Sequence, residues 1–409
     1  MSPAIDFRDV NILFGSASGR GGARLRERAL AMLDAGNTRA EIAAATGIVI
    51  GVARASLSVA RGEICVLMGL SGSGKSTLLR AANRLSHVDS GQVLVRDGEG
   101  AVDVARCDRA TLRRIRGQRV AMVFQQFALL PWRSVRDNVG LGLELRGVRP
   151  TERRAIVDEK LRLVGLDNWA DRAVAELSGG MQQRVGLARA FATDADILLM
   201  DEPFSALDPL IRTKLQDDLL ELQRSVQKTI LFVSHDLDEA MKLGNRIAIL
   251  EGGRIVQTGT SEDIMLRPAD DYVAEFVQHV NPLSVLRGRA IMRPLAELPR
   301  EGNAVLLDEQ GAARVTLDAE RRPVSGLVGG IPCPLAAAGG AAVDPSALVV
   351  APAELPLRAL VALQRGVARP LLLVEEDRLV GVCGASEIIG ALSGRAERQP
   401  AVREAVAGV

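Results

Sequence analysis

The sequence has few cysteines, and they do not form a recognisable metal or redox motif. Of 409 residues only four are cysteine: Cys65, Cys107, Cys333 and Cys383. They are scattered along the chain and no C-x-x-C pair occurs, so we expect reduced thiols, as in a cytosolic protein. This pattern disfavours both a disulfide framework and a zinc site.

Long apolar runs and a strong charge of one sign are also missing. No stretch approaches ~18 uninterrupted apolar residues, so the sequence predicts no membrane-spanning helix. The first residues, Met1 to Asp6, lack a basic segment followed by an apolar core, and we expect no signal peptide. The net charge of +1 provides no general attraction to nucleic acid or anionic lipid.

What remains is an ordinary globular composition that is long enough for roughly two or three domains. Strands alternate with helical segments up to about residue 245, which favours a mostly parallel sheet flanked by helices. The character of the sequence changes after Asn281, and no lysine occurs beyond Lys242. We therefore expect one domain over residues 1–281 and a second over residues 282–409.

A glycine-rich loop is the most informative feature. The apolar run Ile64 to Met68 reads as a buried strand, and it is followed by the sequence GLSGSGKST over residues 69–77. Strand, glycine-rich loop and Lys-Ser at a helix start form a phosphate-binding loop. Lys75 can reach the β- and γ-phosphates of a nucleotide, and the Ser76 hydroxyl can ligate Mg²⁺. A plain Gly/Ser turn beside a surface lysine is the alternative.

Two acidic residues follow another buried run. Ile197 to Met200 is uniformly apolar, and Asp201 and Glu202 come directly after it. An acid at the end of a strand beside a phosphate-binding loop is a usual magnesium partner, so Asp201 is a candidate metal ligand. Glu202 could polarise an attacking water. The alternative is a pair of solvated acids at a strand end.

Three further residues or segments are candidates for the same site. Ser178-Gly179-Gly180 opens a long helix and offers a second helix start suited to an anion, although a plain capped helix would look the same. His235 follows a strand, where ligands of parallel sheets gather, and could contact a γ-phosphate. Phe14 could stack on an adenine ring or could simply be a core residue.

Residues 16–50 look like an insertion. Helical periodicity over Ala23 to Asp34 stops at Gly36, and Thr38 to Glu41 has the pattern of a capping box for a second helix that ends near Gly47. The sequence predicts a small helical hairpin on the surface and gives it no role.

Two windows in the C-terminal part resemble each other. Residues 313–329 and 368–384 each contain an apolar strand, a charged turn and a second short strand. An internal repeat of only two copies favours two copies of one small α/β unit rather than a solenoid. Helices are expected over Pro352 to Gln364 and Ala385 to Leu392.

The motifs in their order resemble a known family. GLSGSGKST, Phe124-Gln125, LSGGMQQR, ILLMDEP, Ser205 to Asp208 and Val233 to Asp236 are similar to the nucleotide-binding subunit of ABC transporters. The likeness covers roughly residues 5–280. It implies an ATPase with a mostly parallel sheet, an antiparallel β subdomain and a helical subdomain at about residues 126–190.

The resemblance assigns roles to individual residues. Gln125 looks like the glutamine that senses Mg²⁺ and nucleotide, Glu202 like the catalytic base, and His235 like the switch histidine. Lys75 joins these three as a catalytic residue, and the implied Mg²⁺ ligands are Ser76, Gln125 and Asp201. The implied ATP contacts are Phe14, Gly69, Ser71, Gly72, Ser73, Gly74, Lys75, Ser76, Thr77, Ser178, Gly179, Gly180 and Asp208.

The same resemblance implies partners. The family works as a head-to-tail homodimer that holds two ATP molecules, with two membrane permease subunits and an extracytoplasmic solute-binding protein. The location implied is the cytoplasmic face of the bacterial inner membrane. Met181 stands where the signature of the family has glutamine, which we expect to be harmless.

A finer likeness is to the ATPases of importers for choline, glycine betaine and proline betaine. It rests on the insertion before the phosphate-binding loop, on Asp208 to Thr213, and on the C-terminal repeat. That repeat resembles a tandem CBS module with a degenerate first copy, which in such importers can regulate activity. Leu130 to Arg133 and Asp103 to Cys107 look most like the choline branch.

Two other classes of function compete with an import motor. An ABC-type ATPase of DNA maintenance would need a long coiled-coil insertion or a basic surface, and the sequence has neither. Alternatively, the C-terminal module is an independent ligand sensor and the ATPase is secondary. An importer motor for another small solute also stays open, because the transported solute is selected by other subunits.

Overall fold

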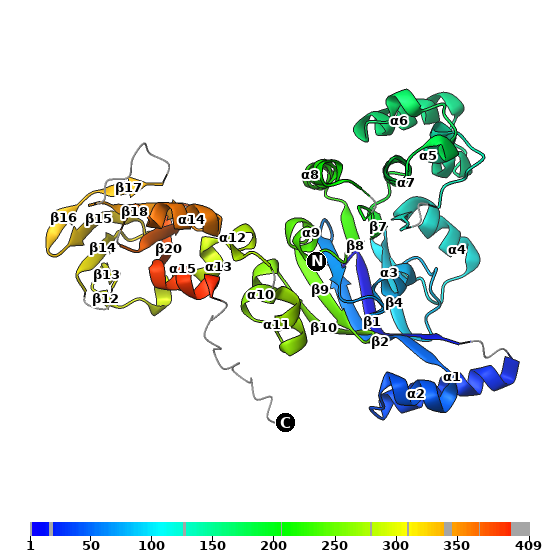
Figure 1. The fold of residues 1–409 in the computed structure, drawn as a ribbon, viewed down its shortest axis with the longest axis horizontal. Coiled ribbons are helices and arrows are strands. Elements are labelled where there is room, and N and C mark those ends of the chain that lie inside the picture. The colour runs from blue at the N-terminus through cyan, green and yellow to red at the C-terminus, as the bar shows by residue number, and fades with distance from the viewer. Residues whose placement is uncertain are drawn as a thin grey trace. The chain divides into compact units, whose positions relative to one another are not determined.

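The computed structural model describes residues 2–15, 19–125, 128–205, 207–278, 280–308, 311–338, 346–367 and 369–393. The chain divides into two compact units, residues 1–260 and 261–409, each described here by itself (Figure 1). Predicted features at residues 16–18, Gln126, Ala206 and Ala368 lie outside the described residues. The predicted boundary between residues 281 and 282 falls within the second unit.

A six-stranded sheet forms the centre of the first unit, in the order β10-β9-β3-β8-β7-β6. The strands from β9 to β6 run parallel and β10 is antiparallel to β9. Every residue of β3, β7 and β8 is buried, as expected for strands covered on both faces. The strands are β3 (Ile64–Met68), β6 (Val120–Val123), β7 (Ile197–Asp201), β8 (Thr229–Val233), β9 (Arg246–Glu251) and β10 (Arg254–Gly259).

Helices accompany this sheet, and α5, α6 and α7 form a separate helical group (Figure 1). The predicted break near Gly147 and Pro150 is confirmed: α5 ends at Leu145 and α6 begins at Pro150, a residue suited to a first helical turn. The helices are α3 (Lys75–Ala81), α4 (Arg109–Arg114), α5 (Val135–Leu145), α6 (Pro150–Leu163), α7 (Gly179–Ala192), α8 (Pro209–Val226) and α9 (Leu237–Leu243).

A second, antiparallel sheet in the order β2-β1-β4-β5 completes the first unit. Its apolar face shares one core with the central sheet and with α3, since Phe7, Leu67 and Leu78 belong to the same buried cluster. Its strands are β1 (Ile5–Phe14), β2 (Val49–Val59), β4 (Ser90–Asp97) and β5 (Gly100–Asp103).

The insertion forms the predicted pair of helices, α1 (Gly19–Asp34) and α2 (Arg39–Thr46). The capping box at Thr38 and Glu41 is present, and Gly47 ends α2 in the left-handed conformation that glycine favours. Leu33 and Ile42 pack with Ile50 of β2 in a small core of their own. The insertion is therefore anchored to the antiparallel sheet.

The second unit contains two five-stranded sheets and several short helices. One sheet, β11-β20-β19-β18-β17, is mixed, and the other, β12-β13-β14-β15-β16, is antiparallel. The helices are α10 (Ser261–Leu266), α11 (Asp271–Val277), α12 (Pro282–Val285), α13 (Gly288–Ile291), α14 (Leu357–Gln364) and α15 (Ala385–Leu392). The strands are β11 (Arg293–Pro294), β12 (Arg300–Glu301), β13 (Ala304–Leu306), β14 (Ala313–Leu317), β15 (Pro323–Val328), β16 (Ile331–Cys333), β17 (Leu335–Ala337), β18 (Leu348–Pro352), β19 (Leu371–Glu375) and β20 (Arg378–Cys383).

Both repeat windows form the predicted hairpins, β14–β15 and β19–β20. Their surroundings differ, however. The second hairpin pairs with β18 through β19, and α14 and α15 pack near it. The first hairpin lies in the antiparallel sheet between β13 and β16. The likeness between the two windows is therefore limited to strand, turn and strand.

Among the described residues, no helix is long and apolar enough to cross a membrane.

Candidate functional site

The loop between β3 and α3 can be built only with glycine at two positions. Gly69 and Gly74 have φ angles of +137° and +101°. A Cβ atom at Gly69 would lie 2.1 Å from the carbonyl oxygen of Leu250, and one at Gly74 would lie 2.5 Å from that of Gly51. Backbone therefore approaches the loop from β9 and β2. This close approach holds the loop in the curved form that a phosphate-binding loop requires.

Lys75 is held inside this loop. Its Nζ donates to the carbonyl oxygens of Gly69 and Leu70 at 2.8 and 2.9 Å, and its side chain is almost fully buried. Burial lowers the pKa of Lys75, while the nearby carboxylates of Glu202 and Asp201 act in the opposite direction. A buried ammonium at the helix start is positioned for an anionic ligand.

The rest of the loop also fits a phosphate. Within the described part of the chain, the buried Oγ atom of Ser73 has no hydrogen-bond partner. A Cβ atom at Gly72 would meet nothing within 4 Å, so open space lies beside the backbone there. An unpaired hydroxyl and a buried ammonium are the groups that phosphate oxygens can satisfy.

Asp201, at the end of β7, is fully buried beneath the loop. Its carboxylate accepts a hydrogen bond of 2.6 Å from the Ser76 hydroxyl. It also forms an ion pair with Arg80, whose Nη2 atom lies 2.9 Å away. The structure thus brings together Ser76 and Asp201, two of the predicted Mg²⁺ ligands. Among the described residues no group of three or more His, Cys, Asp or Glu side chains could hold a metal by itself. A hydroxyl beside one carboxylate suits Mg²⁺, which keeps waters and phosphate oxygens as ligands.

Glu202 has an unusual backbone and two polar neighbours. Its φ is +48°, uncommon for a residue with a side chain, and its backbone N–H donates to Val233 at 3.1 Å. Gln125 Nε2 donates to Glu202 Oε2 at 2.9 Å, and His235 Nδ1 lies 3.5 Å from the same oxygen. Gln125 and His235 therefore both lie at the carboxylate of Glu202. These three predicted catalytic residues follow three different strands.

Two glutamines contact Glu202. Gln125 does so through its amide nitrogen, and its predicted role as a Mg²⁺ ligand, beside Ser76 and Asp201, would use the amide oxygen and stays a prediction. Gln183 of α7, which the sequence analysis missed, donates from Nε2 to the backbone oxygen of Glu202 at 3.3 Å and is fully buried. A glutamine within an ordinary helix carries no local signal of such a contact.

The remaining predicted residues occupy helix starts and one strand end. Ser178 caps α7 through its Oγ atom, and Asp208 caps α8 by accepting from the N–H of Ile211 at 3.0 Å. Phe14 ends β1 and is 47% exposed, and a Cβ atom at Gly51 would lie 2.4 Å from its ring. The carbonyl oxygen of Gly51 in turn faces Gly74 of the glycine-rich loop.

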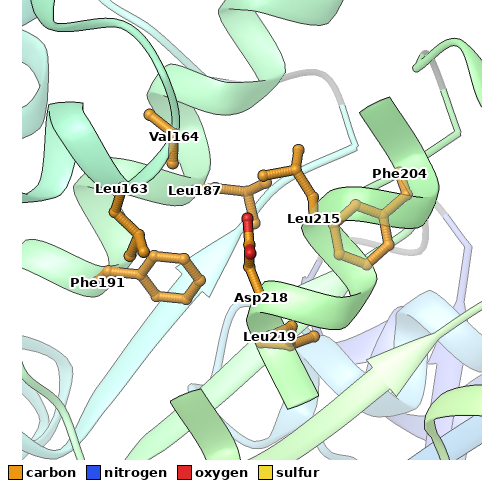
Figure 2. A pocket seen from close by; sticks show the side chains of 8 residues that line it. All are labelled: Leu163, Val164, Leu187, Phe191, Phe204, Leu215, Asp218 and Leu219. Carbon is orange, nitrogen blue, oxygen red and sulfur yellow. The ribbon is translucent and has the colours of Figure 1, made fainter. Parts of the chain in front are cut away.

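A narrow apolar pocket lies between α6, α7 and α8 (Figure 2). The carboxylate of Asp218 lies among its apolar side chains, and burial raises the pKa of this group, opposed by Lys214. The lining residues are Leu163, Val164, Leu187, Phe191, Phe204, Leu215, Asp218 and Leu219. No predicted site residue lines this pocket.

The chain is similar to known transport proteins. The family model described as ABC transporter matches residues 52–205. The glycine betaine/proline betaine transport system ATP-binding protein ProV of Escherichia coli strain K12 is 52% identical over 267 residues, which are 65% of this chain and 66% of that protein. The glycine betaine/carnitine transport ATP-binding protein GbuA of Listeria monocytogenes is 44% identical over 306 residues, 74% and 76% of the two chains. The choline transport ATP-binding protein OpuBA of Bacillus subtilis is 42% identical, over 54% and 56%.

Solved structures of ABC transporter cassettes resemble part of this chain. A bacterial ABC transporter cassette solved as a dimer has a TM-score of 0.53 and 28% identity, covering 63% of this chain and 98% of that one. The same cassette in a post-hydrolysis state with ADP and Pi gives the same values. The chain spans 66% of the length of ProV, slightly less than two thirds, and 76% of the length of GbuA. The ordered motifs, the P-loop fold and this similarity agree: the chain belongs to the family of ATP-binding proteins of ABC transporters.

Proposed function

We propose that this chain is the ATP-hydrolysing motor of a membrane importer for quaternary amines. The observation that carries the proposal is the meeting of Gln125 and His235 at the carboxylate of Glu202, beside the glycine-rich loop. Lys75 and the backbone of that loop bind the β- and γ-phosphates, and Ser76 and Asp201 hold Mg²⁺. When bound there, Mg²⁺ would supply positive charge against the negative charge of the phosphates.

In this mechanism Glu202 orients and polarises the attacking water. Its oxygen Oε2 already accepts from Gln125, so the amide fixes the carboxylate while the second oxygen can accept from water. His235, close to the same carboxylate and largely exposed, is placed to donate to the γ-phosphate. The positive φ of Glu202 is a local strain that such a site can carry.

We place the second anion site of each chain against the nucleotide of a partner copy. Ser178 starts α7, and a Cβ atom at Gly179 would meet nothing within 4 Å, so the backbone at this helix start is accessible. A related cassette is solved as a dimer. A head-to-tail homodimer would bring each Ser178–Gly180 segment to the glycine-rich loop of the other copy. Asp208, which caps the neighbouring helix α8, would lie at the same interface.

The solute is proposed from the named relatives. Identity is 52% to the glycine betaine/proline betaine protein ProV and 42% to the choline protein OpuBA, and this difference supports our choice of glycine betaine or proline betaine ahead of choline. Relatives named for trimethylamine N-oxide transport reach 47%, so another small methylated amine is the nearest alternative. The motor would act with two permease subunits and a solute-binding protein, at the cytoplasmic face of the membrane. Membership of a transporter family disfavours an ATPase of DNA maintenance.

The C-terminal unit is proposed as a CBS-like regulatory module over residues 282–409. The arrangement β18-α14-β19-β20-α15 supports this assignment for the second copy. A cleft beside the start of α15 places Arg293 against Glu387 at 3.1 Å, with Asp308 also in its lining. A cleft lined by charged groups of both signs would respond to salt or to a polar ligand.

Replacing Glu202 by Gln tests the catalytic assignment. The substitution keeps the shape of the side chain and removes its basicity, so we expect ATP binding to persist while hydrolysis falls about 10²- to 10⁴-fold. Nucleotide affinity and phosphate release are measured on the full chain. Glu159→Gln, on the exposed face of α6, is the matched control and should hydrolyse ATP normally. Hydrolysis at the wild-type rate in Glu202→Gln would exclude Glu202 as the base.

A mixing experiment tests the shared sites. Lys75→Ala disables the glycine-rich loop, and Ser178→Arg fills the second anion site, so each variant alone should be inactive. A mixed dimer keeps one intact site, and equal mixing should therefore recover about a quarter of the wild-type hydrolysis. The control mixes Lys75→Ala with the matched inactive variant Lys75→Met, which share the same defect. Recovery in the control, or none in the test mixture, would count against the head-to-tail arrangement.

The solute assignment is tested with the complete transporter in proteoliposomes. Binding protein loaded with glycine betaine should stimulate ATP hydrolysis at least as strongly as binding protein loaded with choline. Glutamine, a solute without a quaternary amine, is the negative control. If only glutamine or another unrelated solute stimulates hydrolysis, the importer assignment is wrong while the ATPase assignment stands.

The regulatory module is tested in the same proteoliposomes. Glu387→Gln removes the charge that faces Arg293, so hydrolysis should keep its maximal rate but change its dependence on salt concentration. Glu376→Gln, in the exposed turn between β19 and β20, is the control. Identical salt profiles for wild type and Glu387→Gln would remove the support for regulation through this cleft.

A further inference from the structure

A buried carboxylate outside the predicted catalytic set lies behind the switch histidine. Glu239, in the first turn of α9, is only 8% exposed. Ser234 Oγ lies 2.6 Å from one of its oxygens, and Gln216 Nε2 of α8 donates to the other at 3.0 Å. Ser234 and Gln216 are themselves buried, at 1% and 5% exposure. Each carboxylate oxygen therefore has one buried donor.

This carboxylate fixes the residues on both sides of His235. Ser234, which immediately precedes the histidine, is held by Glu239 and also accepts from the backbone N–H of Asp236 at 3.0 Å. Asp236, which follows the histidine, caps α9 by accepting from the N–H of Glu239 at 3.1 Å. The backbone of His235 is thus fixed on both sides, while its side chain remains 62% exposed.

The same group of residues reaches the loop that precedes α8. Arg212 lies 3.6 Å from the carboxylate of Asp236, and its Nη2 donates to the carbonyl oxygen of Leu207 at 3.2 Å. Leu207 is next to Asp208, the cap of α8. The positive charge of Arg212 also opposes the effect of burial, which raises the pKa of Glu239. Polar contacts therefore run from the loop at Leu207 to the loop at His235.

We propose that Glu239 is a positioning residue for ATP hydrolysis, which acts by holding the His235 loop so that the imidazole faces Glu202. The proposal rests on the proposed function, because it assigns Glu239 a role only through the histidine. Burying a carboxylate is costly unless its hydrogen bonds are satisfied. Both donors to Glu239 belong to the loop of His235 or to α8, so the carboxylate joins these two elements.

The test is a double-mutant cycle on the full chain. Glu239→Gln replaces one acceptor oxygen by an amide N–H group, so either Gln216 Nε2 faces a second donor or the Ser234 hydroxyl must turn to accept. The loop should therefore loosen. We expect kcat to fall about tenfold with little change in KM, as for coupled residues in contact. In the His235→Ala background the same substitution should have no further effect. Asp238→Asn, an exposed acid in the same turn of α9, is the matched control and should leave kcat unchanged.

Equal reductions of kcat by Glu239→Gln in both backgrounds would show a general structural role and overturn the proposal. An unchanged kcat in the wild-type background would do the same. If His235→Ala and Glu202→Gln hydrolyse ATP normally, it is instead the proposed catalytic site that fails. These outcomes distinguish failure of the positioning role from failure of the site itself.

A second measurement does not depend on activity. The chain has three histidines, so the imidazole signals of ¹³C-histidine-labelled protein can be followed by NMR, with His235 identified by its loss in His235→Ala. The His235 signal should shift or broaden in Glu239→Gln, while that of His87 should stay in place. A His235 signal identical to wild type in position and width would contradict the proposal.

Discussion

A single buried carboxylate links the phosphate-binding loop to the central sheet. Asp201 is fully buried at the end of β7, and it is tolerated there because Ser76 and Arg80 supply a hydrogen bond and an ion pair. An isolated charge in that position would cost several kcal/mol. Removing either partner would therefore disturb the start of α3, where Lys75 is held. The position of the phosphate-binding loop and the burial of Asp201 at the end of β7 therefore depend on each other.

Around this centre, the ends of three neighbouring strands contribute the polar groups of the site. β6 leads to Gln125, β7 to Asp201 and Glu202, and β8 to His235. Because β6, β7 and β8 are neighbours that run parallel, their carboxyl ends meet at one edge of the sheet. The site is thus a consequence of strand order rather than of any single motif. Ser234, Gln216 and Glu239 form buried hydrogen bonds next to the His235 loop at this edge.

Much of the fold could be predicted from the sequence because apolar runs and glycines are local signals. The bounds of β3 and β8 agree with the apolar runs at residues 64–68 and 229–233. The caps of α2 at Thr38 and Gly47 were equally readable. By contrast, α9 and β5 were missed, since a short helix and a short edge strand carry too few residues for a periodic pattern.

The parts of the site that were missed depend on tertiary neighbours. Gln183 meets the backbone of Glu202, and Gln216 meets Glu239, across separations that no local spacing encodes. The first C-terminal window shows the same limit: its strands and charged turn were predicted, but its place in an antiparallel sheet was not. Strand pairing is chosen by the neighbours available, and a single window does not specify them.

The contact between Gly51 and Phe14 has a consequence for the position of the exposed aromatic ring. Any larger side chain in the second strand would push the ring away from the spot it occupies. The position of this ring is thus governed by a residue that belongs to none of the predicted catalytic motifs. Exchanging one hydrogen atom of Gly51 for a methyl group would displace Phe14 and leave every predicted site residue unchanged in the sequence.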